Sequence, residues 1–266
     1  LVRHPKGGLL VINSVNLEDY VKGILYHEVS HYWPPEILKA QAIVCRTYAV
    51  YQARERAGKD FDVTSDVLSQ VYGGLTSERY RTNRAVEETR GKVLTYRGKI
   101  LPAFFHASCG GSTEDASLLW NTSLPPLQGV RCDYCKDSPH YSWHAVLSMK
   151  EIEEKFADAG LPLKKIQNIA ESGRDASGRV TDLMITSSRE IRTMPAKDFR
   201  LYMGPNVIRS TRFNVRVVDS DAVFEGTGWG HGVGMCQWGG YFMAKEGKTY
   251  RDILSFYYPG TDISSL

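Results

Sequence analysis

The sequence predicts an α+β fold, in which helices pack on a mixed, mostly antiparallel sheet beside a long loop region rich in glycine and candidate metal ligands. Two observations predict this class. Segments of helical and of alternating hydrophobic periodicity occur in blocks rather than in strict strand–helix alternation. The stretch 107–142 is rich in Gly, Ser, Pro and Cys and is expected to be mostly loop. We expect one domain over 1–266, with 143–220 as a candidate subdomain although the composition does not shift there.

The N-terminal part is predicted to form a strand and two helices. The first ten residues or so are expected to form a strand, in which residues 9–12 are apolar. Asn16 is a good N-cap for a helix whose apolar positions follow a spacing of i, i+4, i+7 and i+8 from Leu17. Pro35 suits the first position of a second helix, which runs to about Ala57. That helix is apolar on more than one face and is therefore expected to be central to the fold.

The remaining elements follow a short extended piece at 66–72. We expect helices at 78–89, 150–159, 196–203, 236–246 and 250–257. We expect strands at 92–96, 100–105, from 143 onward, and at 166–172, 179–187, 211–218 and 222–226.

Composition excludes several classes of protein. Hydrophobic residues make up 42% and charged residues 24%, as in ordinary globular proteins, so a disordered, collagen-like or coiled-coil chain is excluded. The net charge of +3 lacks the strong basic excess of a general nucleic-acid binder. The apolar stretches are far shorter than the roughly 18 residues that span a bilayer. Since the sequence starts at Leu1 rather than Met, we expect that any targeting segment has been removed.

Glu28 is the first candidate for chemistry. It lies eleven residues after Leu17 and seven after Val21, which places it on the apolar face of the first predicted helix. Partial burial favours the neutral form of a carboxyl group and raises its pKa. At a cleft, such a group suits a general acid at neutral pH. The alternative is a solvated or ion-paired glutamate at a frayed helix end.

The segment 226–240 is the second candidate, because seven of its fifteen residues are glycine. This density suggests special backbone angles or a close approach to a ligand. It lacks the spacing and the Lys-Ser/Thr of phosphate-binding loops. His231, Gln237 and two tryptophans suit a polyhydroxylated or amide-bearing ligand. The alternative is a structural turn packed with aromatic residues.

Cysteine and histidine spacing predicts a metal site. Cys132-x2-Cys135, the remote Cys109 and His140 complete a Cys3His set typical of structural zinc. Either His106 or His144 can replace His140 as the fourth ligand. A disulfide between the two cysteines of the CxxC pair, or free thiols without metal, are the alternatives. Cys45 is expected to be a core residue, and Cys236 is a candidate reactive thiol.

Several ordered motifs make the chain resemble the stage II sporulation protein D family, which also includes amidase-enhancer proteins. The motifs are LEDYVxxIxxxE (17–28), LKAQA (38–42), RTYA (46–49), SQVYGG (69–74), FHASCGGSTED (105–115), GHGVGMxQxG (230–239) and YYPGT (257–261). Some members of that family have a metal site before the QVY motif, but the segment 60–69 has no His or Cys here, so that site is not carried over.

The resemblance implies a peptidoglycan lytic transglycosylase, which cuts the β-1,4 bond between N-acetylmuramic acid and N-acetylglucosamine and leaves a 1,6-anhydro end. The catalytic glutamate of the family falls on Glu28, which first donates a proton and then accepts one. No second carboxylate is needed, unlike in ordinary glycosidases. We assign these residues to substrate positioning or oxocarbenium stabilisation: Arg46, Gln70, Tyr72, His106, Ser108, His231 and Gln237.

Two other functions remain open at this point. The first is a non-catalytic module that binds peptidoglycan and enhances a partner amidase. The second, weaker one is a zinc hydrolase that uses His106 and the cysteines. The resemblance also implies an extracytoplasmic, cell-wall-associated protein, secreted or anchored to the membrane, whose partners are glycan strands rather than nucleic acid.

Overall fold

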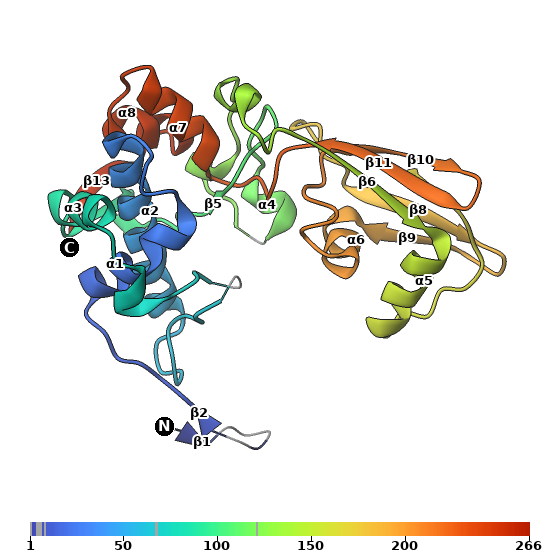
Figure 1. The fold of residues 1–266 in the computed structure, drawn as a ribbon, viewed down its shortest axis with the longest axis horizontal. Helices are drawn as coiled ribbons and strands as arrows, with labels where there is room; N and C mark the ends of the chain where they lie inside the picture. Colours follow the sequence, from blue (N-terminus) through green and yellow to red (C-terminus); the bar gives the residue numbers. More distant parts are fainter. Residues whose placement is uncertain (1, 4–6, 8, 67–68, 121) are drawn as a thin grey trace. The chain divides into compact units, whose positions relative to one another are not determined.

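A computed structural model of the chain describes residues 2–3, 7, 9–66, 69–120 and 122–266 (Figure 1). The chain forms two compact units. The first unit comprises Leu1–Phe104, Ala244–Ser255 and Pro259–Leu266, and the second comprises Phe105–Met243 and Phe256–Tyr258. The candidate subdomain 143–220 lies within the second unit. Helices and mostly antiparallel strands occur in both, which confirms the predicted α+β class.

The first unit is built around two helices. Asn16 caps α1 (Leu17–Glu28), since its side chain accepts a hydrogen bond from the backbone N–H of Glu18. Pro35 opens α2 (Pro35–Glu55), as predicted. The other elements of this unit are β1 (Val2–Arg3), β2 (Leu9–Leu10), the 3-10 turn Gly74–Ser77, α3 (Tyr80–Glu88), β3 (Lys92–Tyr96), β4 (Lys99–Ile100), most of α8 (Tyr250–Tyr257) and β13 (Asp262–Ser265).

Helix α2 is the centre of the first unit's core. Eleven of its residues are buried, on more than one face, as its apolar composition predicts. The hydroxyl of Thr47 on α2 accepts a hydrogen bond of 2.9 Å from the backbone N–H of Leu94 on β3. Strand β3 in turn is the middle strand of the antiparallel sheet β13-β3-β4. This hydrogen bond therefore fixes the position of α2 relative to the sheet.

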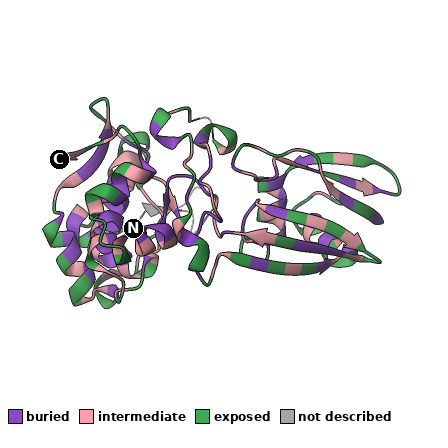
Figure 2. Cartoon of the chain, turned by 90° about the horizontal axis from the view of Figure 1, so that it is seen from above, coloured by how far each residue is buried: buried purple, intermediate pink, exposed green. Residues whose placement is uncertain are grey.

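The second unit contains two three-stranded antiparallel sheets. One has the order β10-β11-β6 and the other β7-β8-β9. Their strands alternate between buried and exposed residues (Figure 2). The buried strand side chains, among them Phe224, form one apolar core with helical side chains such as Phe156 and Phe199. The elements are β5 (Phe105–His106), α4 (Ala116–Leu119), the 3-10 turns Pro125–Leu127 and Tyr134–Asp137, β6 (Ser142–Ser148), α5 (Met149–Asp158), β7 (Ile166–Glu171), β8 (Asp182–Ser187), β9 (Ile191–Pro195), α6 (Ala196–Met203), β10 (Phe213–Val218), β11 (Asp221–Thr227), β12 (Met235–Cys236) and most of α7 (Gln237–Lys245).

A short parallel pair joins two motifs of the second unit. Strand β12 pairs with β5, so that Met235 lies opposite Phe105 and Cys236 lies opposite His106. This pairing brings the glycine-rich segment beside the FHASC motif. The loop predicted between 107 and 142 is mostly irregular, with one short helix and two 3-10 turns.

Some expected elements differ in the structure. The strand expected at 100–105 is divided between β4 and β5, with 101–104 in neither. No strand forms in the described residues of the expected extended piece, 66 and 69–72, while residues 67–68 lie outside the described part of the chain. Strands β9 and β13 were not predicted, because each is short and polar and carries little hydrophobic alternation. Among the described residues, no helix has both the length and the apolar character that crossing a membrane requires.

Candidate functional site

Glu28 is the last residue of α1 and is half-buried. The helix buries Val21, Ile24 and Leu25 on its inner side, and the next residue, Val29, is also buried. The carboxyl group thus lies at the edge of the first unit's core, as the helical spacing predicts.

Glu28 interacts electrostatically with two tyrosine hydroxyls and one thiol. Burial is the main cause that raises the pKa of Tyr20, Cys45 and Tyr48, and the charge of Glu28 raises all three further. Tyr20 lies two turns earlier on α1, whereas Cys45 and Tyr48 lie on α2. Glu28 therefore acts electrostatically on groups that line both helices.

The QVYGG motif lies against α1 beside these groups. The Tyr20 hydroxyl donates a 3.1 Å hydrogen bond to Oε1 of Gln70, and the rings of Tyr20 and Tyr72 stack with centroids 5.6 Å apart. A Cβ at position 23 would lie 2.5 Å from the Tyr72 ring, so Gly23 leaves the room that this ring occupies. Nε2 of Gln70 is buried and, within the described part of the chain, has no hydrogen-bond partner. A buried donor without a partner is costly, which suits an amide that meets a polar ligand.

Arg46 has a different role from the predicted one. Its side chain is completely buried and forms a bidentate ion pair with Glu18, at 2.9 Å from Nε to Oε1 and 2.7 Å from Nη2 to Oε2. The remaining donors bond to the carbonyls of Val86 and Lys92. Since every part of the guanidinium is used inside the core, Arg46 positions α1 against α2 rather than a substrate.

Gln41 is a candidate that the sequence analysis missed. It lies on the buried part of α2, where Nε2 donates a 3.3 Å hydrogen bond to Sγ of Cys45. Its Oε1 has no partner among the described residues. The sequence signal for it was a single amide within an otherwise apolar helical face.

In the second unit, the structure brings His106 and His231 together. Their rings lie 5.6 Å apart, and both bond to the backbone of Val233. Nδ1 of His106 lies 3.1 Å from the Val233 carbonyl, whereas Nδ1 of His231 accepts a 3.0 Å hydrogen bond from the Val233 N–H. Burial lowers the pKa of His231 to about 3 and that of His106 well below its ordinary value. Both rings are therefore neutral at pH 7.

Ser108 and Gln237 occupy the same part of the second unit. The backbone of Ser108 exchanges two hydrogen bonds with Trp229, of 3.0 and 2.7 Å, and its side chain is fully buried. Gln237 begins α7 directly after Cys236 and is 7% exposed. Four of the predicted residues thus gather around the glycine-rich segment. In the first unit, Gln70 and Tyr72 both contact Tyr20 on α1.

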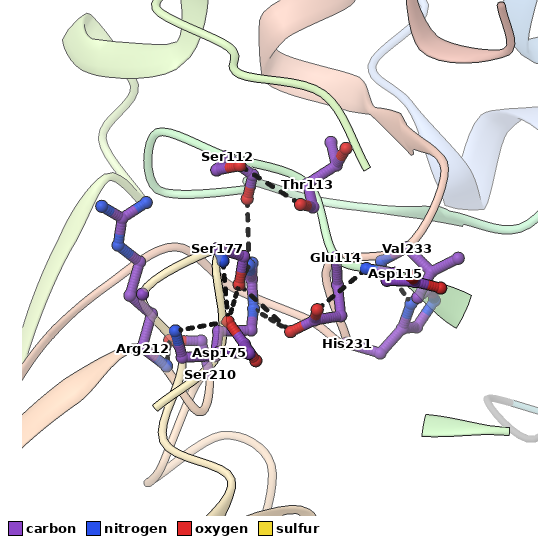
Figure 3. Close-up of polar contacts among 12 residues, drawn as sticks. Ser112, Thr113, Glu114, Asp115, Asp175, Ser177, Ser210, Arg212, His231 and Val233 are labelled. Carbon is purple, nitrogen blue, oxygen red and sulfur yellow. Dashed lines mark hydrogen bonds and ion pairs between the residues drawn. The ribbon is translucent and has the colours of Figure 1, made fainter. Parts of the chain in front are cut away.

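A buried ion pair supports the glycine-rich segment. Nε of Arg179 lies 3.8 Å from Oε2 of Glu114, and both side chains are at most 2% exposed. Glu114 also accepts hydrogen bonds from the backbone of Asp115 and from Ser177 (Figure 3). A Cβ at position 232 would lie 2.5 Å from the Arg179 guanidinium, and Gly232 has a φ of 91°, so this position requires glycine. The pair therefore fixes the backbone beside His231.

Replacing Glu114 by glutamine is expected to change how stability depends on pH. Burial raises the pKa of Glu114 to about 7, although Arg179 lowers it, whereas the ordinary value is 4.5. Between these values the folded protein binds more protons than the unfolded chain, so its stability falls as pH rises from 4.5 to 7. Relative to Glu114→Gln, the wild type should lose about 1–3 kcal/mol across that window, measured by urea unfolding. A difference that does not vary with pH would contradict this assignment.

Four cysteines gather in the second unit. The sulfurs of Cys109, Cys132, Cys135 and Cys236 all lie within 4.8 Å of one another and are buried, an arrangement that can hold a metal ion. The structure thus brings Cys236, rather than His140, to the three predicted ligands. The His140 ring packs instead against Trp229, with centroids 4.8 Å apart.

The two histidines considered as replacements also lie outside this group. Nδ1 of His106 bonds to Val233, and His144 is an exposed residue of β6 opposite Glu225. Sequence spacing missed Cys236 because it is brought in by the β5–β12 pairing rather than by nearness in the chain.

Comparison with known proteins shows related sequences over nearly the whole chain. Residues 5–96 match the family model described as Stage II sporulation protein, and residues 129–234 match a domain of unknown function, DUF8618. An uncharacterised protein of Brachyspira hyodysenteriae is 39% identical over 96% of this chain and 68% of its own length. Stage II sporulation protein D of Bacillus subtilis is 32% identical over 95% of this chain and 76% of its own length. The amidase enhancer of Bacillus subtilis is 30% identical over 92% of this chain, which spans 40% of that protein.

Proposed function

Because the chain belongs to the stage II sporulation protein D family, we propose that it is a peptidoglycan lytic transglycosylase. Its substrate is the glycan strand, in which it cuts the β-1,4 bond between N-acetylmuramic acid and N-acetylglucosamine. The product is a strand that ends in 1,6-anhydro-N-acetylmuramic acid. The observation that carries this proposal is the half-buried Glu28 at the end of α1, whose charge acts on the hydroxyls of Tyr20 and Tyr48.

One carboxyl group is sufficient for the reaction. In its neutral form Glu28 donates its proton to the glycosidic oxygen while the bond from that oxygen to C1 breaks. The resulting carboxylate then takes the proton of the C6 hydroxyl as O6 forms a bond to C1. Glu28 ends neutral, ready for another cycle, and no water enters the product. Since the attacking oxygen belongs to the same sugar, orientation alone gives it a high effective concentration.

The surrounding side chains suit substrate positioning. In the first unit, Nε2 of Gln70 is a buried donor without a hydrogen-bond partner among the described residues, and the rings of Tyr20 and Tyr72 form a stacked pair next to this side chain. In the second unit, His231 bonds through Nδ1 to Val233 and makes a further backbone hydrogen bond to Phe105. Because both hydrogen bonds hold the neutral ring, we assign His231 to positioning and not to proton transfer.

The proposal includes an extracytoplasmic location at the cell wall, secreted or anchored to the membrane. A relative is named amidase enhancer, so a cell-wall amidase is the proposed protein partner. The alternative function follows from the same name: a module that binds peptidoglycan and assists such an amidase without cutting the strand. In either case zinc has no part in catalysis here, and a zinc ion held by the cysteines is structural.

Product analysis tests the proposal directly. Purified protein is incubated with glycan strands from which the stem peptides have been removed, and the products are identified by mass spectrometry. We expect products with 1,6-anhydro-muramyl ends, which are lighter by one water than reducing ends. Products with reducing ends would instead indicate a hydrolase. Binding of the strands without any cleavage would overturn the enzyme proposal and favour the amidase-assisting module.

A further inference from the structure

Cys109, Cys132, Cys135 and Cys236 come from three separate segments of the second unit. Cys109 follows β5, the CxxC pair flanks the start of the 3-10 turn Tyr134–Asp137, and Cys236 ends β12. All four side chains are 0% exposed. The apolar core of the sheets lies elsewhere in the unit and includes none of them. The four sulfurs therefore form a group of their own, apart from the apolar core of the sheets.

We infer that Cys109, Cys132, Cys135 and Cys236 bind one zinc ion as four thiolates in a closed, structural site. Zinc in such sites is tetrahedral, with zinc–sulfur distances of about 2.3 Å, which separates the sulfurs by about 3.8 Å. The four sulfurs lie within 4.8 Å of one another, and Sγ of Cys109 and Cys135 are 3.4 Å apart. The sulfurs thus already have nearly the spacing of a zinc tetrahedron. This inference goes beyond the proposed glycan cleavage and does not depend on it.

Two backbone donors point at the sulfur of Cys236. Its Sγ accepts hydrogen bonds of 3.2 Å from the N–H groups of Cys109 and Gly239. Such outer hydrogen bonds orient metal ligands and stabilise their negative charge. The buried Arg179 donates a 2.9 Å hydrogen bond to the carbonyl of Cys109. A site of four thiolates and one Zn²⁺ carries a net charge of −2, which a nearby cation offsets.

The sulfur of Cys132 is closely packed between Tyr257 and Gly239. Its Sγ lies 3.1 Å from the hydroxyl of Tyr257. A Cβ at position 239 would collide with that hydroxyl and would lie 3.0 Å from Sγ of Cys132. Glycine is therefore required in the first turn of α7. The ring of Tyr257 is completely buried over the cluster, which keeps water away from the sulfurs.

The four cysteine ligands give the zinc ion a structural role rather than a catalytic one. Four protein thiolates fill all four positions of tetrahedral zinc, so no position remains for water or substrate. The ion links the loop after β5, the CxxC loop and the start of α7. The residues next to these ligands include His106, Ser108 and Gln237, so the metal fixes the backbone that presents them. Folding of this region is therefore coupled to metal binding.

Metal analysis of the whole purified chain tests the inference without any substrate. The protein is prepared under reducing conditions without a metal-binding tag, and zinc is measured by elemental analysis. We expect one zinc per chain in the wild type. Cys236→Ser should weaken zinc binding by more than the roughly 100-fold that loss of an outer-shell partner costs. Cys45→Ser, which removes the fifth cysteine from α2, and His140→Ala should retain the wild-type zinc content.

A second measurement uses only the wild-type protein, so it does not depend on whether a variant folds. Cobalt replaces zinc in the wild-type protein, and the intensity of sulfur-to-cobalt charge-transfer absorption reports the number of thiolate ligands. We expect the intensity of four thiolates. The inference is overturned by wild-type protein that contains no stoichiometric metal, that holds iron with sulfide, or that has a disulfide among these four cysteines. Loss of zinc in His140→Ala together with its retention in Cys236→Ser would overturn the ligand set. None of these results depends on whether the protein cuts glycan strands.

Discussion

Replacing Glu28 by glutamine is expected to abolish the release of 1,6-anhydro products. Glutamine keeps the size and the hydrogen-bonding capacity of the side chain but can neither donate nor accept the proton. General acid–base catalysis by one group contributes about 10²- to 10⁴-fold, and Glu28 acts in both proton transfers of the proposed reaction. We therefore expect the rate of cleavage to fall by at least about 10³-fold, measured as anhydro ends released per unit time.

Asp19→Asn is the matched control for this experiment. Asp19 lies on the same helix and undergoes the same change from carboxyl to amide, but its side chain is 58% exposed and its ion pair with Lys22 spans 3.6 Å. Such exposed pairs contribute about 0–1 kcal/mol, so the control should cleave strands at the wild-type rate. Glu28→Gln should remain folded, which its thermal unfolding checks, because glutamine has nearly the same shape as glutamate. Cleavage by a folded Glu28→Gln protein would remove Glu28 from the mechanism.

Local signals in the sequence predicted the helices and the position of Glu28 well. The N-cap Asn16 and Pro35 fix where α1 and α2 begin, since both act through their own neighbours in the chain. The eleven-residue spacing from Leu17 places Glu28 at the edge of the core. By contrast, β13 carries only four residues of mixed polarity, and it becomes a strand through its pairing with β3.

The parts of the site that depend on distant pairing were not predictable. The spacing of cysteines and histidines favoured His140 as the fourth ligand because it follows the CxxC pair closely in the chain. Cys236 reaches the cluster only because β12 pairs with β5, and no local pattern signals that parallel pairing. The role of Arg46 likewise depends on a contact with a residue far away in the sequence. A motif assigns it to the substrate, whereas burial beside Glu18 uses every part of its guanidinium in the core.

Replacing Arg46 by alanine is expected to destabilise the protein by about 3–5 kcal/mol, because it leaves the buried carboxylate of Glu18 without its partner. Glu18 is 6% exposed, and its carboxylate also accepts a 3.0 Å hydrogen bond from the backbone N–H of Gly91. The Val86 and Lys92 carbonyls also lose their donor. The free energy of unfolding is measured by urea denaturation at neutral pH, where the carboxylate is charged in the unfolded chain.

A double-mutant cycle separates the structural role of Arg46 from substrate positioning. Glu18→Gln and Arg46→Met are made singly and together, and we expect the double variant to be less destabilised than the sum of the two single variants. The difference measures the buried ion pair, since both charges disappear together in the double variant. If Arg46 contacted the substrate instead, Arg46→Met would keep the wild-type stability while cleavage fell. A folded double variant that cleaves glycan strands at the wild-type rate would show that the pair holds α1 and α2 together without taking part in the reaction.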